Sequence, residues 1–278
     1  MGLNEELVGK EYGTSTFEVT ADHIDRYARA TNDLNERYIS GGDDVVAPPV
    51  FPVVAAFGAF MSAAMDPELE ADLLRLVHGA EEHVLYRAIK PGDVLTVSPV
   101  LESVEKKDSG ETFTAKANLT DPDGQLVAEV RGTMFIRGSG SKGTSTSTDE
   151  GAREIIYEEA TKVDDDQTFR YAEASGDHNP IHVDAGTAQM AGLPGIICHG
   201  MCTMAIATKA AVNGLAGGDP TRIKRVGVRL SKPVLPGQEL TTKLWKEADG
   251  DRETIYGFET YNQDGQAVIK QGVVEIAN

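Results

Sequence analysis

An internal repeat limits the folds open to this chain more than any other feature of its sequence. At one constant offset in residue number, residues early in the first half recur in the second half: Val19, Asp22, Arg26, Tyr27, Ala28, Ala30, Asp33 and Asn35 match Val163, Asp166, Arg170, Tyr171, Ala172, Ala174, Asp177 and Asn179. With small gaps, the similarity continues through IKPGDVL (89–95) against VLPGQEL (234–240) and reaches the Asp-Gly pairs at 123–124 and 264–265. We interpret the pattern as a duplication, so the fold must be one that works as a pair of similar units.

A polar segment separates the two copies. Residues 138–151 read GSGSKGTSTSTDEG, and such a composition cannot bury enough apolar surface to order itself. The length of 278 residues also fits two domains of similar size. The sequence therefore predicts an N-terminal repeat over residues 1–137, a flexible linker over 138–152 and a C-terminal repeat over 153–278.

Each repeat shows the same order of elements, which is clearest in the second. A short helix rich in Ala and Tyr is predicted over 167–175, then a loop containing proline, then a mostly apolar helix over 200–212 that ends at Gly214. Strands follow over 222–233, 239–246, 254–261 and 267–276, with hairpin turns at Asp249-Gly250 and Asp264-Gly265. In the first repeat, matching strands follow Glu82.

This order predicts an α+β fold in which each antiparallel sheet wraps around a central helix. Two such units can pair their sheets edge to edge, which would cover an edge that is otherwise open to other chains.

The composition excludes several classes of protein. A formal charge of −18 argues against nucleic-acid binding, which needs a basic surface. No apolar run reaches the roughly 20 residues that cross a bilayer, and residues 1–10 lack the apolar core of a signal peptide. The two cysteines, Cys198 and Cys202, are too few and too close for a disulfide framework. We expect a cytoplasmic protein with no membrane or nucleic-acid partner.

The densest group of polar and turn-forming residues is YAEASGDHNPIHVD at 171–184. The helix should end near Gly176, and Pro180 favours an extended or turn backbone in the residue before it. The loop then presents three polar side chains, Asp177, Asn179 and His182. A carboxylate beside an imidazole can move protons to and from water and a substrate carbon. On spacing alone, a structural alternative stays open, in which the Asp and Asn cap a turn and the histidine is an interior residue.

The first repeat helps to separate these alternatives. Its equivalent loop, YARATNDLNERYI, keeps Asp33 and Asn35. Three positions differ: Asn32, Glu36 and Tyr38 stand where the second repeat has Gly176, Pro180 and His182. A loop with a purely structural role should keep its backbone-shaping residues in both copies. We therefore expect one working site in the second repeat and one retired site in the first.

The loop of the second repeat resembles the signature of the MaoC-like dehydratases, also called type 2 or R-specific enoyl-CoA hydratases. The stretch YAEASGDHNPIH (171–182) carries the likeness, together with GLPGIICHGMCTMAIA (192–207) and VRLSKPVLPGQEL (228–240). The likeness covers the second half almost end to end. In the first half, APPVFPVV (47–54) is similar to the degenerate N-terminal repeat, or to the non-catalytic partner subunit, of the same superfamily.

This resemblance implies a double hot-dog fold, with the helix that begins near Gly200 at the centre of the second repeat. It implies that Asp177 and His182 hold and activate water and exchange the proton at C2 of the substrate, and that Asn179 positions one of them or the water. The backbone N–H of Gly200 is suited to polarise the thioester carbonyl, because the first N–H groups of a helix have no intrahelical partner. We expect no metal or redox cofactor, since the thioester itself acidifies C2; coenzyme A or phosphopantetheine is part of the substrate.

Two other groups of residues have a structural and a functional explanation. His178 and His182 lie four apart, as two metal ligands on one helix face would, but Pro180 breaks such a helix, so we expect no metal site. A basic cluster stands out in the acidic chain, comprising Arg222, Lys224, Arg225, Arg229 and Lys232. It is either a solvated strand face or a contact for the phosphates of coenzyme A or of a carrier's phosphopantetheine.

From this cluster we take Arg222, Arg225, Arg229 and Lys232 as candidate substrate-binding residues. The apolar run 45–65 in the first repeat is either ordinary core or a pocket for the acyl tail.

We thus expect a hydro-lyase that reversibly hydrates trans-2-enoyl-CoA, or a related acyl-carrier thioester, to the 3-hydroxyacyl form, and the resemblance implies the R configuration. One alternative is a hot-dog thioesterase, which would more often carry a carboxylate on the central helix, where residues 200–212 have none. Another is a non-catalytic subunit that binds acyl thioesters, against which the complete second loop argues. A fused double repeat can act alone, and the formation of a homodimer is left open.

Overall fold

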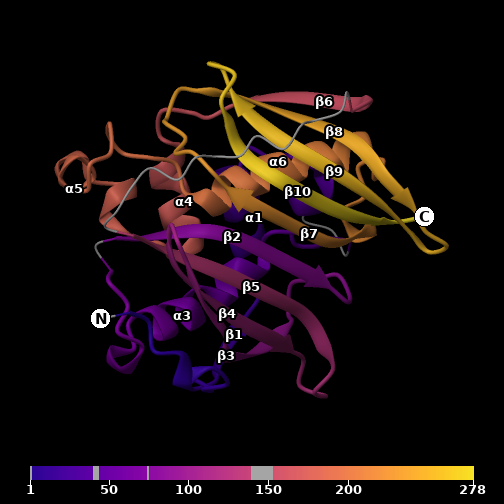
Figure 1. Cartoon of the computed structure of the whole chain (residues 1–278). Helices are drawn as coiled ribbons and strands as arrows, with labels where there is room; N and C mark the ends of the chain where they lie inside the picture. The colour runs from indigo at the N-terminus through magenta and orange to yellow at the C-terminus, as the bar shows by residue number, and fades with distance from the viewer. Residues whose placement is uncertain (1, 40–43, 74, 139–152) are drawn as a thin grey trace.

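The computed structural model describes residues 2–39, 44–73, 75–138 and 153–278. The predicted linker, from residue 139 onward, lies outside the described residues. The two repeats fold into the same succession of elements, which is a first strand, a short helix, a long central helix and a run of long strands (Figure 1).

The elements are as follows, with η marking a 3-10 helix. The first repeat contains η1 (Glu5–Leu7), β1 (Ser15–Glu18), α1 (Ala21–Ala30), α2 (Glu36–Ile39), α3 (Pro52–Ala64), η2 (Pro67–Leu69), β2 (Leu76–Leu85), β3 (Val94–Lys107), β4 (Gly110–Thr120) and β5 (Leu126–Arg137). The second repeat contains β6 (Ile155–Lys162), α4 (Gln167–Ser175), η3 (Pro180–His182), α5 (Ala185–Met190), α6 (Gly200–Gly214), η4 (Pro220–Arg222), β7 (Ile223–Leu230), β8 (Glu239–Asp249), β9 (Glu253–Asn262) and β10 (Ala267–Ala277).

The predicted helices and strands of the second repeat are confirmed, with differences at some ends. Helix α4 ends where predicted because Gly176 adopts a left-handed conformation (φ 78°), which glycine tolerates. Strand β7 ends at Leu230, whereas the predicted strand extended to residue 233. In the first repeat, β2 begins at Leu76, earlier than the expected start after Glu82.

The strands form one ten-stranded sheet in the order β1-β3-β4-β5-β2-β7-β10-β9-β8-β6. At the middle of this order, residues 80–84 of β2 pair antiparallel with residues 225–229 of β7. We call this junction the β2–β7 seam. The two repeats therefore pair their sheets edge to edge, and the predicted α+β fold is confirmed.

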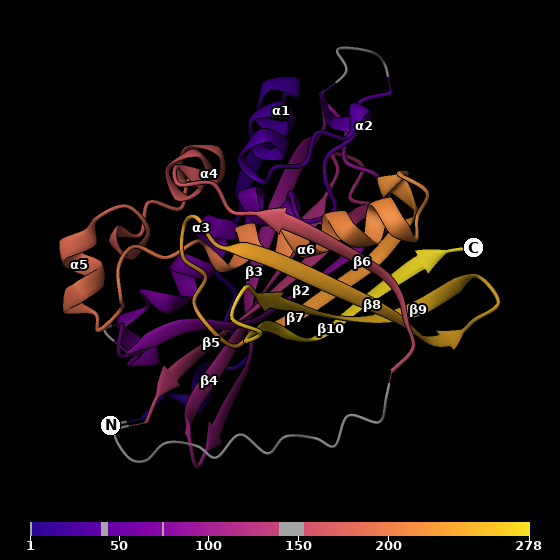
Figure 2. The same cartoon turned by 90° about the horizontal axis from the view of Figure 1, so that it is seen from above.

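The central helices α3 and α6 each pack against the strands of their own repeat. Helix α3 contacts β3 and β4, α6 contacts β7 and β10, and α1 lies beside α4 (Figures 1 and 2). Every residue of α6 from 201 to 208 is buried, so this helix lies inside the core of its repeat. Within the described residues, we find no helix with the length and apolar character that a membrane crossing requires.

A buried carboxylate lies at the β2–β7 seam. Glu81 has a fully buried side chain, which accepts hydrogen bonds from Nε2 of His78 (2.8 Å) and Nε2 of His83 (3.0 Å). Burial by itself raises the pKa of the Glu81 carboxyl, but the two imidazole hydrogen bonds outweigh burial and hold that pKa below its usual value. The charged carboxylate thus stabilises the fold above its unfolded-state pKa, and this stabilisation is lost as the pH falls through the folded-state pKa.

We expect Glu81→Gln to lower the free energy of unfolding at pH 7 by about 1–3 kcal/mol, because a neutral amide cannot replace a carboxylate that accepts from two imidazoles. Urea denaturation measures this change. Glu82→Gln is the matched control, since Glu82 forms a partly exposed ion pair with Arg225 and its loss should cost less than about 1 kcal/mol. Equal losses in both variants would contradict the stronger role of the buried carboxylate.

Candidate active site

The loop after α4 is shaped by its own side chains. Oδ1 of Asp177 accepts the N–H of Asn179 (3.1 Å), and Oδ1 of Asn179 accepts the N–H of Ile181 (3.3 Å). Pro180 then opens the 3-10 turn η3, where its fixed φ is favourable. These turns carry the chain inward, so His182 is only 7% exposed while Asn179 stays at the surface.

His182 is oriented as a neutral base. Its Nδ1 donates to the carbonyl of Ile197 (2.8 Å), which leaves Nε2 as the unprotonated nitrogen of the neutral ring. Burial lowers the pKa of His182 below its usual value, although the nearby Asp177 acts in the opposite direction. One acidic oxygen of Asp177 and one ring nitrogen of His182 lie within 4.8 Å of one another. The structure therefore brings the predicted pair together.

A second histidine, which the sequence interpretation did not place in the site, lies against this pair. His199 is 1% exposed and its ring stacks on His182, with the centroids 3.8 Å apart. Its Nε2 donates to the backbone carbonyl of Asp177 (2.9 Å). Burial, and then the nearby His182, lower the pKa of His199 to about 3. The signal in the sequence was its position directly before Gly200, at the start of the central helix.

Gly200 begins α6, where the sequence placed it. The side chain of His199 does not cap this helix, and the N–H of Gly200 lies in the first turn, which has no carbonyl of its own to bond. A Cβ at this position would lie 2.4 Å from Cδ1 of Leu230 on β7. Packing against Leu230 thus requires a glycine at this position. This requirement is separate from the predicted role of the glycine, which is to let a thioester approach.

The distances of this cluster raise the question of a metal ion, since His182 and His199 lie near the Asp177 carboxylate. The two imidazole planes are only 26° apart, so the lone pairs in the two rings do not point to a common centre. These residues fit proton transfer better than metal binding, and the absence of a metal stays a prediction.

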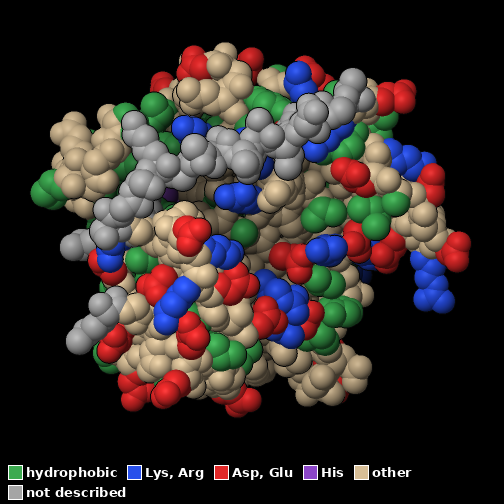
Figure 3. Space-filling view, in the orientation of Figure 1, with side chains coloured by type: hydrophobic (Ala, Val, Ile, Leu, Met, Phe, Trp, Pro, Cys, Tyr) green, Lys and Arg blue, Asp and Glu red, His purple; other side chains and the backbone are tan. Residues whose placement is uncertain are grey.

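The structure does not gather the predicted basic residues at this loop. Arg222 donates to the carbonyl of Ala277, and Arg225 bonds both Glu82 and Glu275. Arg229 is exposed and lies an even number of residues from Arg225 on β7, hence on the same face. Basic and acidic side chains are interleaved across the face shown in Figure 3 rather than forming one basic patch.

Leu230, by contrast, faces α6 through its contact with Gly200, so Arg225 and Arg229 point away from that helix. Lys232 lies two residues after Leu230, beyond the end of β7, and its side chain is exposed.

The first repeat keeps the shape of the loop. Oδ1 of Asp33 accepts from Asn35 (3.3 Å), and Oδ1 of Asn35 accepts from Arg37 (2.9 Å), as in the second repeat. Asn32 also has a positive φ (54°), like its counterpart Gly176. The Asp-Asn pair therefore shapes the backbone in both copies and does not by itself distinguish a working site.

Three other residues differ between the two repeats. Tyr38 stands for His182 in the sequence repeat, while Phe51 and Pro52 begin α3 where His199 and Gly200 begin α6. Proline has no backbone N–H, so the first repeat lacks the donor that Gly200 offers.

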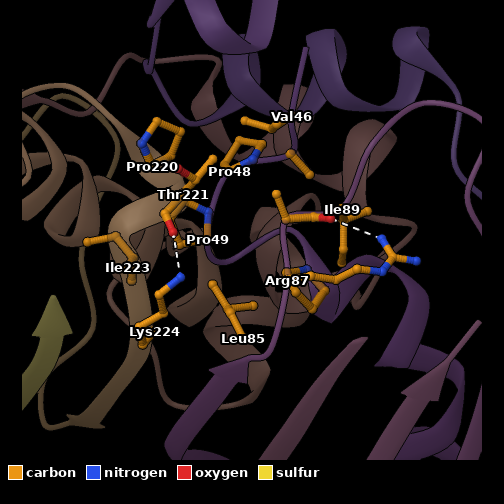
Figure 4. A pocket seen from close by; sticks show the side chains of 13 residues that line it. Val46, Pro48, Pro49, Leu85, Arg87, Ile89, Pro220, Thr221, Ile223 and Lys224 are labelled. Atoms are coloured by element: carbon orange, nitrogen blue, oxygen red, sulfur yellow. Dashed lines mark hydrogen bonds between the residues drawn. The ribbon is translucent and has the colours of Figure 1, made fainter. Parts of the chain in front are cut away.

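An apolar pocket lies at this end of α3, between the repeats (Figure 4). Pro48, Pro49 and Pro52 line it, together with Leu85 and Ile89. The cations at its rim are already engaged, since Arg87 binds Asp93 (2.7 Å) and Lys224 donates to the carbonyl of Thr221 (2.9 Å). Part of the predicted apolar run 45–65 thus lines a pocket, whereas α3 itself is mostly core. That this pocket holds the acyl tail of a substrate stays a prediction.

Two family models match the chain. A family model described as MaoC like domain matches residues 148–266, and one described as FAS1-like, dehydratase domain region matches residues 6–130. The 3-hydroxyacyl-thioester dehydratase Y of Mycobacterium tuberculosis is 31% identical over 243 residues, which cover 83% of this chain and 79% of that protein. The peroxisomal enoyl-CoA hydratase 2 of Arabidopsis thaliana is 26% identical, with 78% of this chain and 75% of that protein covered.

Solved structures show the same fold. A MaoC-like dehydratase from Phytophthora Capsici superposes with a TM-score of 0.87 at 24% identity, over 100% of this chain and 98% of that one. A Mycobacterium tuberculosis protein described as having a double hot-dog fold gives a TM-score of 0.65 at 12% identity, over 97% of this chain and 96% of that one. The predicted double hot-dog architecture is confirmed.

The contact between Gly200 and Leu230 gives a test of the packing at the start of α6. We expect Gly200→Ala to lower the free energy of unfolding by about 1–3 kcal/mol, because the added methyl overpacks the site. In a Leu230→Ala background the same substitution should cost little, since the space is then open. Urea denaturation of the four proteins forms a double-mutant cycle, and strictly additive losses would contradict this contact.

Proposed function

The chain belongs to the MaoC-like dehydratase family, and we propose that it is a hydro-lyase that reversibly hydrates trans-2-enoyl-CoA to (R)-3-hydroxyacyl-CoA at the Asp177 loop. The relatives named 3-hydroxyacyl-thioester dehydratase and enoyl-CoA hydratase support the reaction class. The observation that carries the proposal is the buried, neutral His182, held by Ile197 beside the Asp177 carboxylate.

In the hydration direction, Nε2 of His182 takes a proton from a water molecule while the water oxygen bonds to C3 of the enoyl group. The C2=C3 electron pair moves towards the thioester, and C2 becomes enolate-like. The N–H of Gly200 stabilises the charge that develops on the thioester oxygen, helped by the positive end of α6. A proton then passes from the Asp177–His182 pair to C2, which restores the thioester carbonyl. Dehydration follows the same steps in reverse.

The proposed roles of the remaining residues are narrower than the sequence alone suggested. Asn179 bonds the backbone of Ile181, so we assign it to loop shape as well as to the predicted positioning of water or of its neighbours. Among the basic residues, we propose Lys232 as the first candidate for a phosphate contact. No metal or redox cofactor enters these steps, since the thioester acidifies C2.

Two alternatives make different predictions. A hot-dog thioesterase would attack C1, and the central helix α6 carries no carboxylate for that purpose. A non-catalytic binding subunit would be expected to show replacements like Tyr38 and Pro52 in both repeats, whereas the second repeat has His182 and Gly200. A cytoplasmic location and a homodimer stay predictions from the sequence.

We expect the protein to remove the enoyl-thioester absorbance of crotonyl-CoA and of longer trans-2-enoyl-CoAs. Asp177→Asn and His182→Ala should each reduce kcat about a hundredfold or more, as the loss of an acid/base group does. The repeat supplies a matched control, because Asp33→Asn makes the same change in the retired loop and should leave kcat within about twofold. Release of free thiol without loss of the enoyl absorbance would instead establish the thioesterase reaction.

The pH dependence follows from the burial of His182. A base works in its unprotonated form, and burial lowers the pKa of this imidazole, so the acid limb of kcat/KM should lie below the ordinary value of about 6.5. The titratable groups that face His182 are Asp177 from its own loop and His199 from α6. A profile of kcat/KM with crotonyl-CoA measures the limb, and a midpoint above 6.5 would contradict a buried neutral base.

A further inference from the structure

His199 joins three parts of the active site that come from different elements. It is the N-cap residue of α6, directly before Gly200. Its ring stacks on His182, and its Nε2 bonds the backbone of Asp177. We propose that His199 is a positioning residue, which holds the Asp177 backbone and the His182 ring in register with the first N–H groups of α6. The proposal rests on the proposed hydratase function.

The hydrogen bond from His199 to Asp177 ties the loop to the start of α6. The carbonyl of Asp177 accepts Nε2–H of His199 (2.9 Å), a contact between residues 22 apart in the sequence. On the other side of the same residue, the N–H of Asp177 donates to Oγ of Ser175 at 3.2 Å, which ties it back to α4. The loop is thus anchored to both α4 and α6. Loss of the second anchor would let the carboxylate shift relative to Gly200.

The stack determines how His182 is placed and solvated. His199 lies between two rings, with the centroid of His182 at 3.8 Å and that of Tyr171 at 4.8 Å. One face of the base is therefore covered by an aromatic ring rather than by water. Because burial and His182 lower the pKa of His199 to about 3, His199 stays neutral when His182 takes a proton. It adds no like charge beside the base.

The geometry favours positioning over direct proton transfer by His199. Its Nε2–H is already donated to Asp177, and its Nδ1 is buried without a hydrogen-bond partner among the described residues. Neither nitrogen is thus exposed to a substrate. The residue acts through Asp177 and His182.

The first repeat shows that packing alone does not require a histidine. Phe51 is the N-cap residue of α3 and packs on Tyr27 with centroids 5.5 Å apart, as His199 packs on Tyr171. An aromatic ring is therefore enough for the core at this position. Phe51 lacks the ring N–H with which His199 holds the Asp177 carbonyl. It also stands in the repeat that has Tyr38 in place of the base His182 and Pro52 in place of the backbone donor Gly200.

Two substitutions separate the two contacts. His199→Phe copies the first repeat, so it keeps a ring against His182 and loses the hydrogen bond to Asp177. His199→Gln places an amide N–H near the position of Nε2 and removes the stacked ring. We expect His199→Phe to lower kcat on crotonyl-CoA about tenfold to a hundredfold with KM changed less than about threefold, since a displaced catalytic group slows the chemical step.

His199→Gln should keep kcat within about fivefold of the wild type. With the ring gone, water reaches one face of His182, so the acid limb of kcat/KM should move up towards about 6.5. In His199→Phe this limb should stay in place. Circular dichroism and urea denaturation check that both variants are folded at the assay temperature.

A titration of His182 by NMR of its ring nitrogens tests the proposal without turnover. The midpoint pH of the His182 titration should be higher in His199→Gln than in the wild type, and it should be unchanged in His199→Phe. If the wild type turns over no enoyl-CoA, the proposed function fails while these midpoints still decide the placement of His182. If the wild type is active and His199→Phe keeps kcat within twofold, or both variants lose activity only in step with folded protein, the positioning role is overturned.

Discussion

Antiparallel pairing of β2 with β7 joins the two repeats into one sheet, and the other contacts between them are arranged around that seam. Because the sheets are continuous there, α1 and α4 come to lie side by side, and Tyr27 packs on Tyr171 with centroids 5.7 Å apart. Gln167 of α4 donates to the carbonyl of Ala30 at the end of α1. The loops that follow α1 and α4 therefore begin from one shared, buried interface. The loop that carries Asp177 and His182 takes its fixed starting point from this interface.

The same arrangement shows how the first repeat keeps its fold without the histidine and the backbone donor that the second repeat has. Asp33 and Asn35 still form the turns of their loop, and Phe51 still fills the core beside Tyr27. These residues preserve the surface on which the second repeat rests. Pro52 removes a backbone donor at no cost to α3, because the first helical position has no intrahelical acceptor for an N–H. The residues that shape the loop and the core are thus different from the residues to which we assign catalysis.

The sequence predicted the features that depend on local chemistry and on the repeat. The duplication indicated two similar units joined edge to edge, Gly176 marked the end of α4, and the Asp-Gly pairs marked hairpins. The edge strands β1 and β6 and the short helix α5 were not predicted. In β6, IIYEEATK places charges on neighbouring positions and lacks a clear alternation.

Features that depend on which way a side chain points were harder to predict. The basic residues of β7 form a cluster in the sequence, but strand alternation turns Arg225 and Arg229 away from α6, and Arg225 bonds Glu82 instead. The part played by His199 depends on a stack between residues of η3 and α6, which no spacing along the chain reveals. The reason for Gly200 is similar, because Leu230 approaches it from a distant strand.

The most direct test of the central claim, one working site in the second repeat, is a crystal structure of the Asp177→Asn protein with a trans-2-enoyl-CoA bound. The account predicts the thioester oxygen at about 3 Å from the N–H of Gly200, with C3 facing Nε2 of His182. An enoyl thioester bound instead at the Pro52 pocket of the first repeat, or with its carbonyl away from the start of α6, would contradict the account.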